Sequence, residues 1–210
     1  MELYSYFRSS ASFRVRIALG LKGLPYVYRG VHLQKNEQLG ADYAAKAPSK
    51  LVPLLINGEH RFAQSLAIIE YLDETHPTPP LLPATPVERA RVRGLALDIA
   101  CEIHPLNNLR VLRYLVRELH VPDEAKTAWY RHWVESGLAV VEQQLSAAPD
   151  TFCHGERPTL ADCVLVPQIF NAQRFNCDLD HVPNVMRVFD ACMKLEAFER
   201  ARPENSPDAE

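Results

Sequence analysis

Hydrophobic and polar residues follow two different periodicities in the first part of the chain. Apolar positions three or four residues apart predict a helix after Arg14, another near residues 41–47 and a third that opens at Gln64–Ser65. Short apolar runs predict strands at the start of the chain and at residues 26–33, 51–56 and 60–63. The pair Asn57–Gly58 predicts a hairpin between the last two strands, and Lys22–Gly23 marks the end of the first helix.

The rest of the chain shows only the helical periodicity. It predicts a helix from Val87 to about Leu119, which His104–Pro105 kinks or breaks, and a second helix from Asp123 to Leu145. The run Thr159-Leu160-Ala161-Asp162 has the form of a capping box that begins a buried helix through Ile169, so Asp162 is interpreted as structural. Prolines crowd the stretch between the two patterns, as in a linker: Pro77, Pro79, Pro80, Pro83 and Pro86.

These patterns predict two domains. The order β, α, β, α, β, β, α is that of a thioredoxin-like domain, which we place at residues 1–82. An all-α domain is expected to follow at residues 83–210. The predicted fold class is therefore α/β plus all-α.

Polar residues that can carry chemistry lie between the first strand and the first helix. Arg8, Ser9 and Ser10 occupy this turn. Unpaired backbone N–H groups and the positive end of the helix dipole favour an anion there, such as a thiolate or a carboxylate. Taken alone, the motif favours a simpler interpretation, in which the serines cap the helix and the arginines, Arg8, Arg14 and Arg16, belong to a solvated face.

Two further features lie near strand and helix ends. Pro53 stands at the mouth of a strand, where a proline is tolerated. A cis Val52–Pro53 bond would turn the N–H and C=O of Val52 outward to pair with an extended peptide, although a trans bond is the commoner case. Gln64 and Ser65 open the next helix, where Ser65 either receives a carboxylate or acts only as an N-cap.

Together these segments resemble the zeta class of the glutathione transferases, whose members include maleylacetoacetate and maleylpyruvate isomerases. The resemblance rests on residues 7–19, which are specific to the class, and on 51–53 and 64–72, which glutathione transferases share generally. It continues through residues 103–110, 158–162 and 173–175, so it covers nearly the whole chain. The class motif commonly reads Ser-Ser-Cys-Ser, and Ala11 stands at the cysteine position here. A role of that thiol in redox sensitivity or self-inactivation is therefore absent.

The resemblance implies a glutathione site and a substrate site. Ser9, or Ser10 close behind it, would face the glutathione sulfur, and the sequence does not say which. The implied glutathione-binding residues are Ser9, Ser10, Gln38, Val52, Gln64, Ser65, His104, Asn107 and Asn108. The asparagines could instead cap the helix break. The implied dicarboxylate-binding residues are Arg8, Arg110 and Arg174, since the planar fork of arginine suits carboxylates.

The implied reaction converts a cis double bond conjugated to a carbonyl into its trans isomer. A thiolate that adds to the bond and leaves again permits rotation, so glutathione acts as a cofactor, and a positioned cation or amide stabilises the enolate oxygen. Ser9, Ser10 and Arg8 are the expected catalytic residues. The sequence does not separate maleylacetoacetate from maleylpyruvate as substrate.

Two alternatives remain open. The same residues could serve glutathione transfer or dehalogenation of small α-halo acids. The fold could also be a non-enzymatic interaction module, although such a scaffold has no need of the serine and arginine set. The resemblance further implies a homodimer, and a two-fold pair is the commonest closed assembly.

Composition and charge narrow the class of partners. The 210 residues are 47% hydrophobic and carry a formal net charge of −3, which argues against a nucleic-acid-binding surface. No apolar stretch reaches membrane-spanning length and no signal peptide is recognised, so we expect a cytoplasmic protein without membrane contact. Five widely spaced cysteines without a CxxC pair indicate reduced thiols, and no residues show metal-ligand spacing. The polar tail at residues 203–210 is expected to be frayed.

Overall fold

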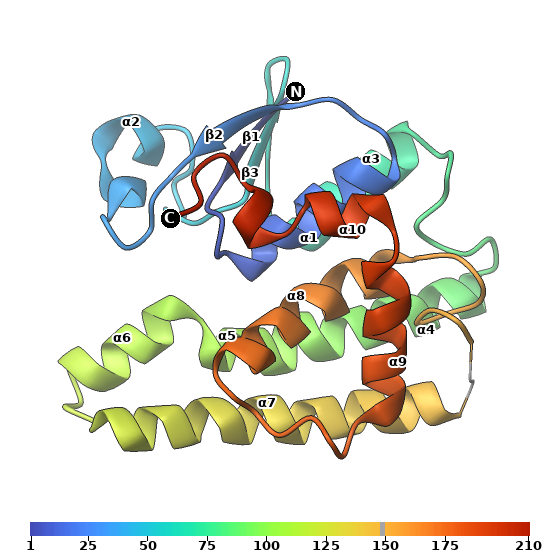
Figure 1. Ribbon diagram of the computed structural model, residues 1–210. Helices are drawn as coiled ribbons and strands as arrows, with labels where there is room; N and C mark the ends of the chain where they lie inside the picture. Colours follow the sequence, from blue (N-terminus) through green and yellow to red (C-terminus); the bar gives the residue numbers. More distant parts are fainter. Residues whose placement is uncertain (148–149) are drawn as a thin grey trace. The chain divides into compact units, whose positions relative to one another are not determined.

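The computed structural model describes residues 1–147 and 150–210, and the contacts within it divide the chain into two compact units (Figure 1). The first unit contains Met1–Leu81 together with Met193–Glu210, and the second contains Leu82–Cys192. The division near residue 82 falls beside the predicted boundary. The last segment of the chain, however, belongs with the first unit, whereas the predicted all-α domain of residues 83–210 included it.

The first unit is built on a four-stranded sheet of order β2-β1-β3-β4. β1 (Glu2–Ser5) pairs in parallel with β2 (Val27–Gly30) and antiparallel with β3 (Leu54–Asn57), which pairs antiparallel with β4 (His60–Ala63). The strands predicted at 26–33 and 51–56 are present but shorter. β3 begins only after Pro53, which has no N–H to give to a ladder.

The helices of the first unit complete the predicted βαβαββα order. They are α1 (Ser10–Leu21), η1 (Glu37–Leu39), α2 (Ala41–Ala44) and α3 (Ser65–Thr75), with α10 (Glu196–Arg200) and η3 (Pro203–Asn205) returning from the C-terminal segment. The sequence pattern predicts one buried stripe on α1, but residues 12–19 are all buried, because α3 and α10 both pack on this helix. Gly23, at φ +62°, ends α1 as predicted.

The C-terminal tail is ordered against the first unit, so the expectation that it is frayed is wrong. In Figure 1 the red C-terminal segment runs back beside the sheet of this unit. The Asp208 carboxylate accepts hydrogen bonds from the Phe7 N–H and the Tyr28 hydroxyl. The Glu210 carboxylate pairs with Lys35 at 2.6 Å. Polar residues thus anchor this tail through specific partners that its composition does not reveal.

The regular elements described for the second unit are all helical, as predicted. They are α4 (Pro86–Leu97), the π-helix η2 (Asp98–Ile103), α5 (His104–Asn107), α6 (Leu109–Arg117), α7 (Asp123–Ser146), α8 (Leu160–Arg174) and α9 (Pro183–Met193). The predicted long helix is interrupted at His104–Pro105 as expected, because α4 gives way to the π-helix η2 directly before it and α5 begins at His104. A second break, which was not predicted, lies at Asn108, where the backbone is extended. Pro105 lies in the first turn of α5, where a missing N–H is tolerated. In the described ranges, no helix has the length and apolar character needed to cross a membrane.

The capping box at the start of α8 is present as predicted. Thr159 and Asp162 cap each other, and the Asp162 carboxylate accepts from the Thr159 N–H at 2.7 Å and the Cys153 N–H at 2.8 Å. Burial raises the pKa of Asp162, which is completely enclosed. These contacts confirm that Asp162 has a structural role. The helix then continues past the predicted end at Ile169 to Arg174.

Candidate active site

The sheet of the first unit brings its predicted glutathione-binding segments to one end. Tyr4 pairs with Leu54, and Leu54 pairs with Ala63, so the C-terminal ends of β1 and β4 lie beside the first residue of β3. β2 runs parallel to β1 and ends at the same edge. The segments that leave or enter these strand ends contain the predicted residues of this unit: Arg8, Ser9, Ser10, Gln38, Val52, Gln64 and Ser65.

Ser9 and Ser10 differ in what surrounds them at the end of β1. Ser9 is the N-cap of α1, and its Oγ accepts a hydrogen bond from the Ser12 N–H at 3.2 Å. A hydroxyl that accepts in this way still has its own proton to donate. Ser9 is half-buried, whereas Ser10 is only 5% exposed. Ser9 therefore offers the more accessible hydroxyl at the positive end of the α1 dipole.

Ser65 stands at the N-terminus of α3 beside a buried cation. The side chain of Arg14, 3% exposed on α1, donates from Nη1 to the Ser65 Oγ at 3.3 Å. Gln64, which precedes the helix, has a backbone φ of +70°. Residues other than glycine rarely adopt such an angle, and it recurs at ligand sites. Unpaired helix N–H groups next to a guanidinium form a favourable place for a carboxylate.

Sequence reasoning missed Arg14 as part of this site, and the interpretation of the arginines as a solvated face is wrong for Arg14 and Arg16. Both side chains are 3% exposed. A signal was available, because residues two apart on a helix point in directions roughly 200° apart and cannot share one solvated face. Arg16 donates to the Phe7 carbonyl at 3.1 Å and to the Ser5 Oγ at 3.1 Å, so it holds the segment that leads to Ser9.

Val52 and Gln38 present polar groups outside the regular ladders. The ladder of β3 begins at Leu54, so the backbone of Val52 takes no part in it, and the Val52–Pro53 bond is cis. The Tyr43 hydroxyl fixes the neighbouring Leu51 carbonyl at 2.6 Å. Gln38 is buried, and its Oε1 has no hydrogen-bond partner in the part of the chain that the structure describes. A buried acceptor without a partner is a candidate contact for a polar ligand.

The predicted residues of the second unit fall into two groups. His104 and Asn107 lie on α5, and Asn107 is 5% exposed, with neither amide atom hydrogen-bonded among the described residues. Asn108 is the N-cap of α6, since its Oδ1 accepts from the N–H groups of Arg110 at 3.1 Å and Val111 at 3.2 Å. The alternative role as a helix cap is therefore confirmed for Asn108. Asn107 makes no such cap, so its amide can donate to and accept from a ligand.

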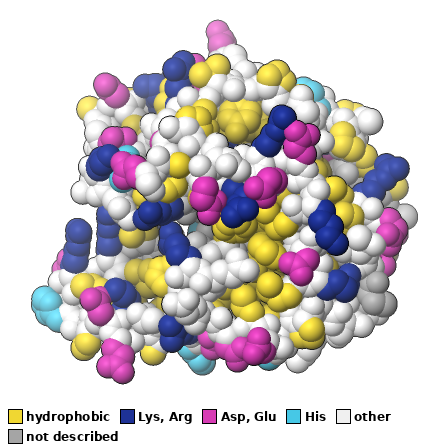
Figure 2. Space-filling view, in the orientation of Figure 1, with side chains coloured by type: hydrophobic (Ala, Val, Ile, Leu, Met, Phe, Trp, Pro, Cys, Tyr) yellow, Lys and Arg dark blue, Asp and Glu magenta, His cyan; other side chains and the backbone are white. Residues whose placement is uncertain are grey.

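The three candidate arginines are exposed. The guanidinium of Arg8 lies 4.9 Å from the centroid of the Phe7 ring, and that of Arg174, at the end of α8, lies 4.9 Å from the Phe175 ring. An aromatic ring beneath a guanidinium restricts how its planar fork points. Arg110 lies on α6. On the face drawn in Figure 2, Lys and Arg side chains lie among Asp and Glu, so charge alone does not single out a substrate-binding arginine.

Several of the protein's own thiols are unsuited to act as nucleophiles. Burial raises the pKa of Cys177 to about 11, and it raises the pKa of Cys153 and Cys192 further still. These three thiols stay protonated near neutral pH, whereas the thiolate is the reactive form. The described residues also contain no group of three or more His, Cys, Asp or Glu side chains arranged to hold a metal ion.

Two family models match the chain. Glutathione S-transferase, N-terminal domain, matches residues 3–80, and Glutathione S-transferase, C-terminal domain, matches residues 124–193. A protein of Vibrio cholerae named probable maleylacetoacetate isomerase is 50% identical over 209 residues, which cover 99% of this chain and 97% of the relative.

Solved structures are similar over the full length. A holo structure of maleyl pyruvate isomerase, a bacterial glutathione S-transferase of the zeta class, has a TM-score of 0.98 at 46% identity, with 100% of each chain covered. A maleylacetoacetate isomerase from Methylobacterium extorquens AM1, with bound malonate and GSH, has a TM-score of 0.96 at 37% identity, again with 100% of each chain covered.

Proposed function

Because the chain belongs to the glutathione S-transferase family, we propose that it is a glutathione-dependent cis–trans isomerase of maleyl-type dicarboxylates, either maleylacetoacetate or maleylpyruvate. The observation that carries this proposal is the Ser9 hydroxyl, held half-exposed at the N-terminus of α1. Full-length relatives and structural neighbours with isomerase names support the same activity.

The residues of the first unit fit glutathione. We assign the γ-glutamyl carboxylate to Ser65 and Gln64, where the buried Arg14 adds positive charge. Val52 would pair its backbone with the cysteinyl part of the peptide, and we assign Gln38 to the glycyl end, where the zeta-class resemblance implies it. When bound, glutathione supplies the thiolate that adds to the substrate's double bond and leaves after rotation.

Ser9 has the role of keeping that thiol ionised. Its hydroxyl donates to the sulfur while its Oγ is held by the Ser12 N–H. The dipole of α1 favours the same negative charge. Ser10 is buried at the start of the helix, which supports Ser9 as the residue that faces sulfur.

The arginines recognise the substrate in this proposal. Arg8 follows β1 directly, and Arg174 and Arg110 belong to the second unit. Each substrate carboxylate can pair with a guanidinium fork, and a cation also stabilises negative charge on the enolate oxygen. The malonate bound with GSH in the Methylobacterium relative is a dicarboxylate, which supports this substrate class.

We also propose that the protein is a cytoplasmic homodimer. A two-fold pair is the commonest closed assembly, and the zeta-class resemblance implies it. The cysteines are free thiols, as is usual in a reducing compartment.

The experiment that tests the function is a spectrophotometric assay of cis–trans isomerisation with maleylacetoacetate and with maleylpyruvate. Each substrate is assayed with and without glutathione. We expect glutathione-dependent isomerisation of at least one of them. If neither is isomerised while a small α-halo acid is consumed together with glutathione, the protein is a transferase or dehalogenase instead.

A further inference from the structure

The C-terminal tail makes a specific contact with the segment that leads to Ser9. The Asp208 Oδ2 accepts a hydrogen bond from the Phe7 N–H at 3.2 Å, across 201 positions of sequence. Its Oδ1 accepts from the Tyr28 hydroxyl at 2.5 Å. One carboxylate therefore joins the segment after β1 to β2 and to the end of the chain.

The backbone of Phe7 is held at both its N–H and its carbonyl. While Asp208 binds its N–H, the buried Arg16 guanidinium donates to its carbonyl from Nη2 at 3.1 Å. Arg16 also donates from Nε to the Ala201 carbonyl at 3.0 Å. Asp208 and Arg16 therefore both connect Phe7 to the C-terminal segment. Phe7 is 4% exposed, and an unmade hydrogen bond at a buried N–H is costly.

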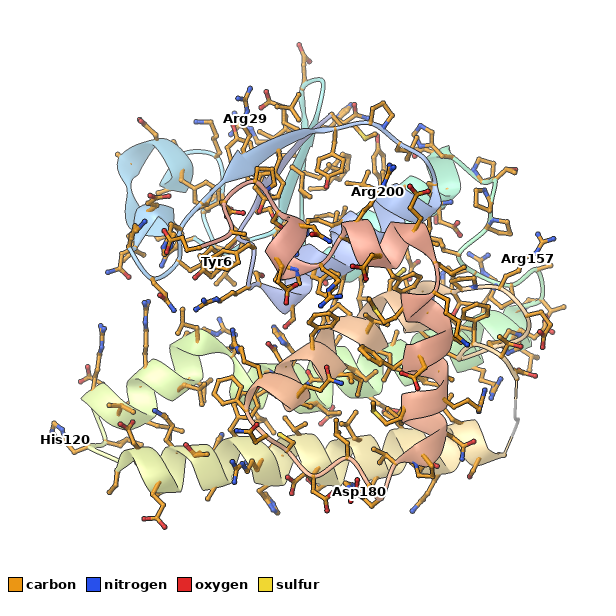
Figure 3. All side chains as sticks on the ribbon, in the orientation of Figure 1. Tyr6, Arg29, His120, Arg157, Asp180 and Arg200 are labelled. Atoms are coloured by element: carbon orange, nitrogen blue, oxygen red, sulfur yellow. The ribbon has the colours of Figure 1, made fainter. Side chains whose placement is uncertain are left out.

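Ser9 is connected to this held peptide by a short backbone path. The Ser9 N–H donates to the Tyr6 carbonyl at 2.9 Å, which closes a tight turn around Phe7 and Arg8. The Tyr6 ring, labelled in Figure 3, packs on His32 with centroids 5.0 Å apart, and His32 contacts Glu210 on the same tail. The turn that orients the Ser9 hydroxyl is thus held by a backbone hydrogen bond and by the contact of the Tyr6 ring with His32.

The tail is fitted closely to β2 as well. A Cβ added at Gly30, the last residue of β2, would lie 3.4 Å from the Asp208 Cβ. Asp208 therefore lies at van der Waals distance from the end of β2, in addition to its hydrogen bond with Tyr28 of the same strand.

We propose that Asp208 is a positioning residue, which fixes the turn at Phe7 and thereby the direction of the Ser9 hydroxyl toward the glutathione sulfur. It acts through the turn and does not touch the cofactor. This inference rests on the proposed role of Ser9 in the glutathione site. It does not depend on which dicarboxylate is the substrate.

Asp208→Ala tests the inference. Loss of the carboxylate frees the Phe7 N–H, so Ser9 no longer holds its hydroxyl on the sulfur. We expect kcat to fall about tenfold and the pH at which bound glutathione becomes a thiolate to rise by about one pH unit. That ionisation is followed by ultraviolet absorbance of the complex. The Kd for glutathione should stay within about twofold, because Val52 and Ser65 are untouched.

Glu204→Ala is the matched control. Glu204 is an exposed carboxylate four residues away on the same C-terminal segment, and it pairs with Arg202 at 3.4 Å instead of with the turn. We expect this variant to keep both kcat and the thiolate titration. Asp208→Asn, which keeps one acceptor oxygen, should restore part of the lost turnover.

Tyr28→Phe gives a second test that leaves the tail sequence intact. It removes the hydroxyl that orients Asp208, so a smaller change in the same direction is expected. An unchanged thiolate titration in both Asp208→Ala and Tyr28→Phe would overturn the assignment, as would an equal effect of Glu204→Ala. If glutathione gave no thiolate signal in the wild-type protein, the proposed glutathione site itself would fail.

Discussion

Ser9 and Ser10 are adjacent in sequence but occupy different environments, and this difference yields the first prediction. Ser9→Ala removes the half-exposed hydroxyl at the N-terminus of α1. We expect kcat/KM to fall by one to two orders of magnitude, or about 1.5–3 kcal/mol, with a smaller change in glutathione affinity. Steady-state kinetics with calorimetric measurement of glutathione binding separates the two effects.

Ser10→Ala provides the control for this prediction. Ser10 is 5% exposed, so its hydroxyl is turned away from solvent. The variant should retain most of the turnover. A larger loss of turnover in Ser10→Ala than in Ser9→Ala would assign the sulfur contact to Ser10.

Arg174→Ala separates substrate recognition from cofactor binding. The guanidinium of Arg174 is exposed and stacked on Phe175, outside the unit that holds Ser9. Loss of a charge-assisted carboxylate contact should lower kcat/KM for the dicarboxylate by about one to two orders of magnitude and leave the glutathione Kd unchanged. If kcat/KM stayed the same, substrate recognition would have to be assigned to Arg8 and Arg110.

Candidate site residues at chain turns were easier to propose from the sequence than groups inside the fold. Ser9 and Ser65 could be found because strand-to-helix turns expose their polar atoms in a recognisable pattern. Arg14, Arg16 and Asp208 were missed, since each acts through a partner far away along the chain: Ser65, Ala201 and Phe7 respectively. Local pattern carries no information about such partners.

At the element scale, the helix break in the second unit allows a stability test. Asn108→Ala removes the side chain that caps α6 through two N–H groups. We expect the free energy of unfolding to fall by about 1 kcal/mol and Tm by about 2–4 °C, measured by thermal denaturation. Asn108→Ser, which keeps a capping oxygen, should lose much less.

Asn107→Ala is the neighbouring control. The Asn107 amide atoms make no hydrogen bond in the described ranges, so their removal should have little effect on Tm. A loss of stability in Asn107→Ala as large as in Asn108→Ala would contradict the capping account. A loss of activity in Asn107→Ala at unchanged Tm would support its predicted role in ligand binding.

The elements themselves were predictable in type and order, because their periodicity reflects which face is buried. The residues at which these elements begin and end were less predictable. The predicted interruption at Pro105 is present, with the π-helix η2 before it and a new helix beginning at His104, but the second break at Asn108 was not predicted. β3 is shorter than its apolar run because hydrogen bonding, not hydrophobicity, defines where a strand begins.

In the whole molecule, the contacts divide the chain beside the proposed boundary at residue 82, and they place Met193–Glu210 with the first unit, which the sequence pattern does not indicate. A helical periodicity shows that a segment packs, and does not show against which unit. The ties of Arg16 to Ala201 and of Asp208 to Phe7 explain the return.

The assembly is tested by light scattering at micromolar concentration. We expect a mass twice the 23.8 kDa of one chain, because a two-fold dimer is proposed. A single-chain mass across the concentration range would remove the dimer from the account. It would leave the glutathione site of the first unit unaffected.

In the proposed function, glutathione serves as a cofactor and is regenerated in each cycle. Isomer formation and free glutathione are therefore followed together in one reaction with the active maleyl substrate. We expect no glutathione-independent enzymatic turnover, and a glutathione concentration that stays constant while many equivalents of the trans isomer form. Loss of one glutathione for each substrate consumed would contradict the claim and identify the protein as a transferase.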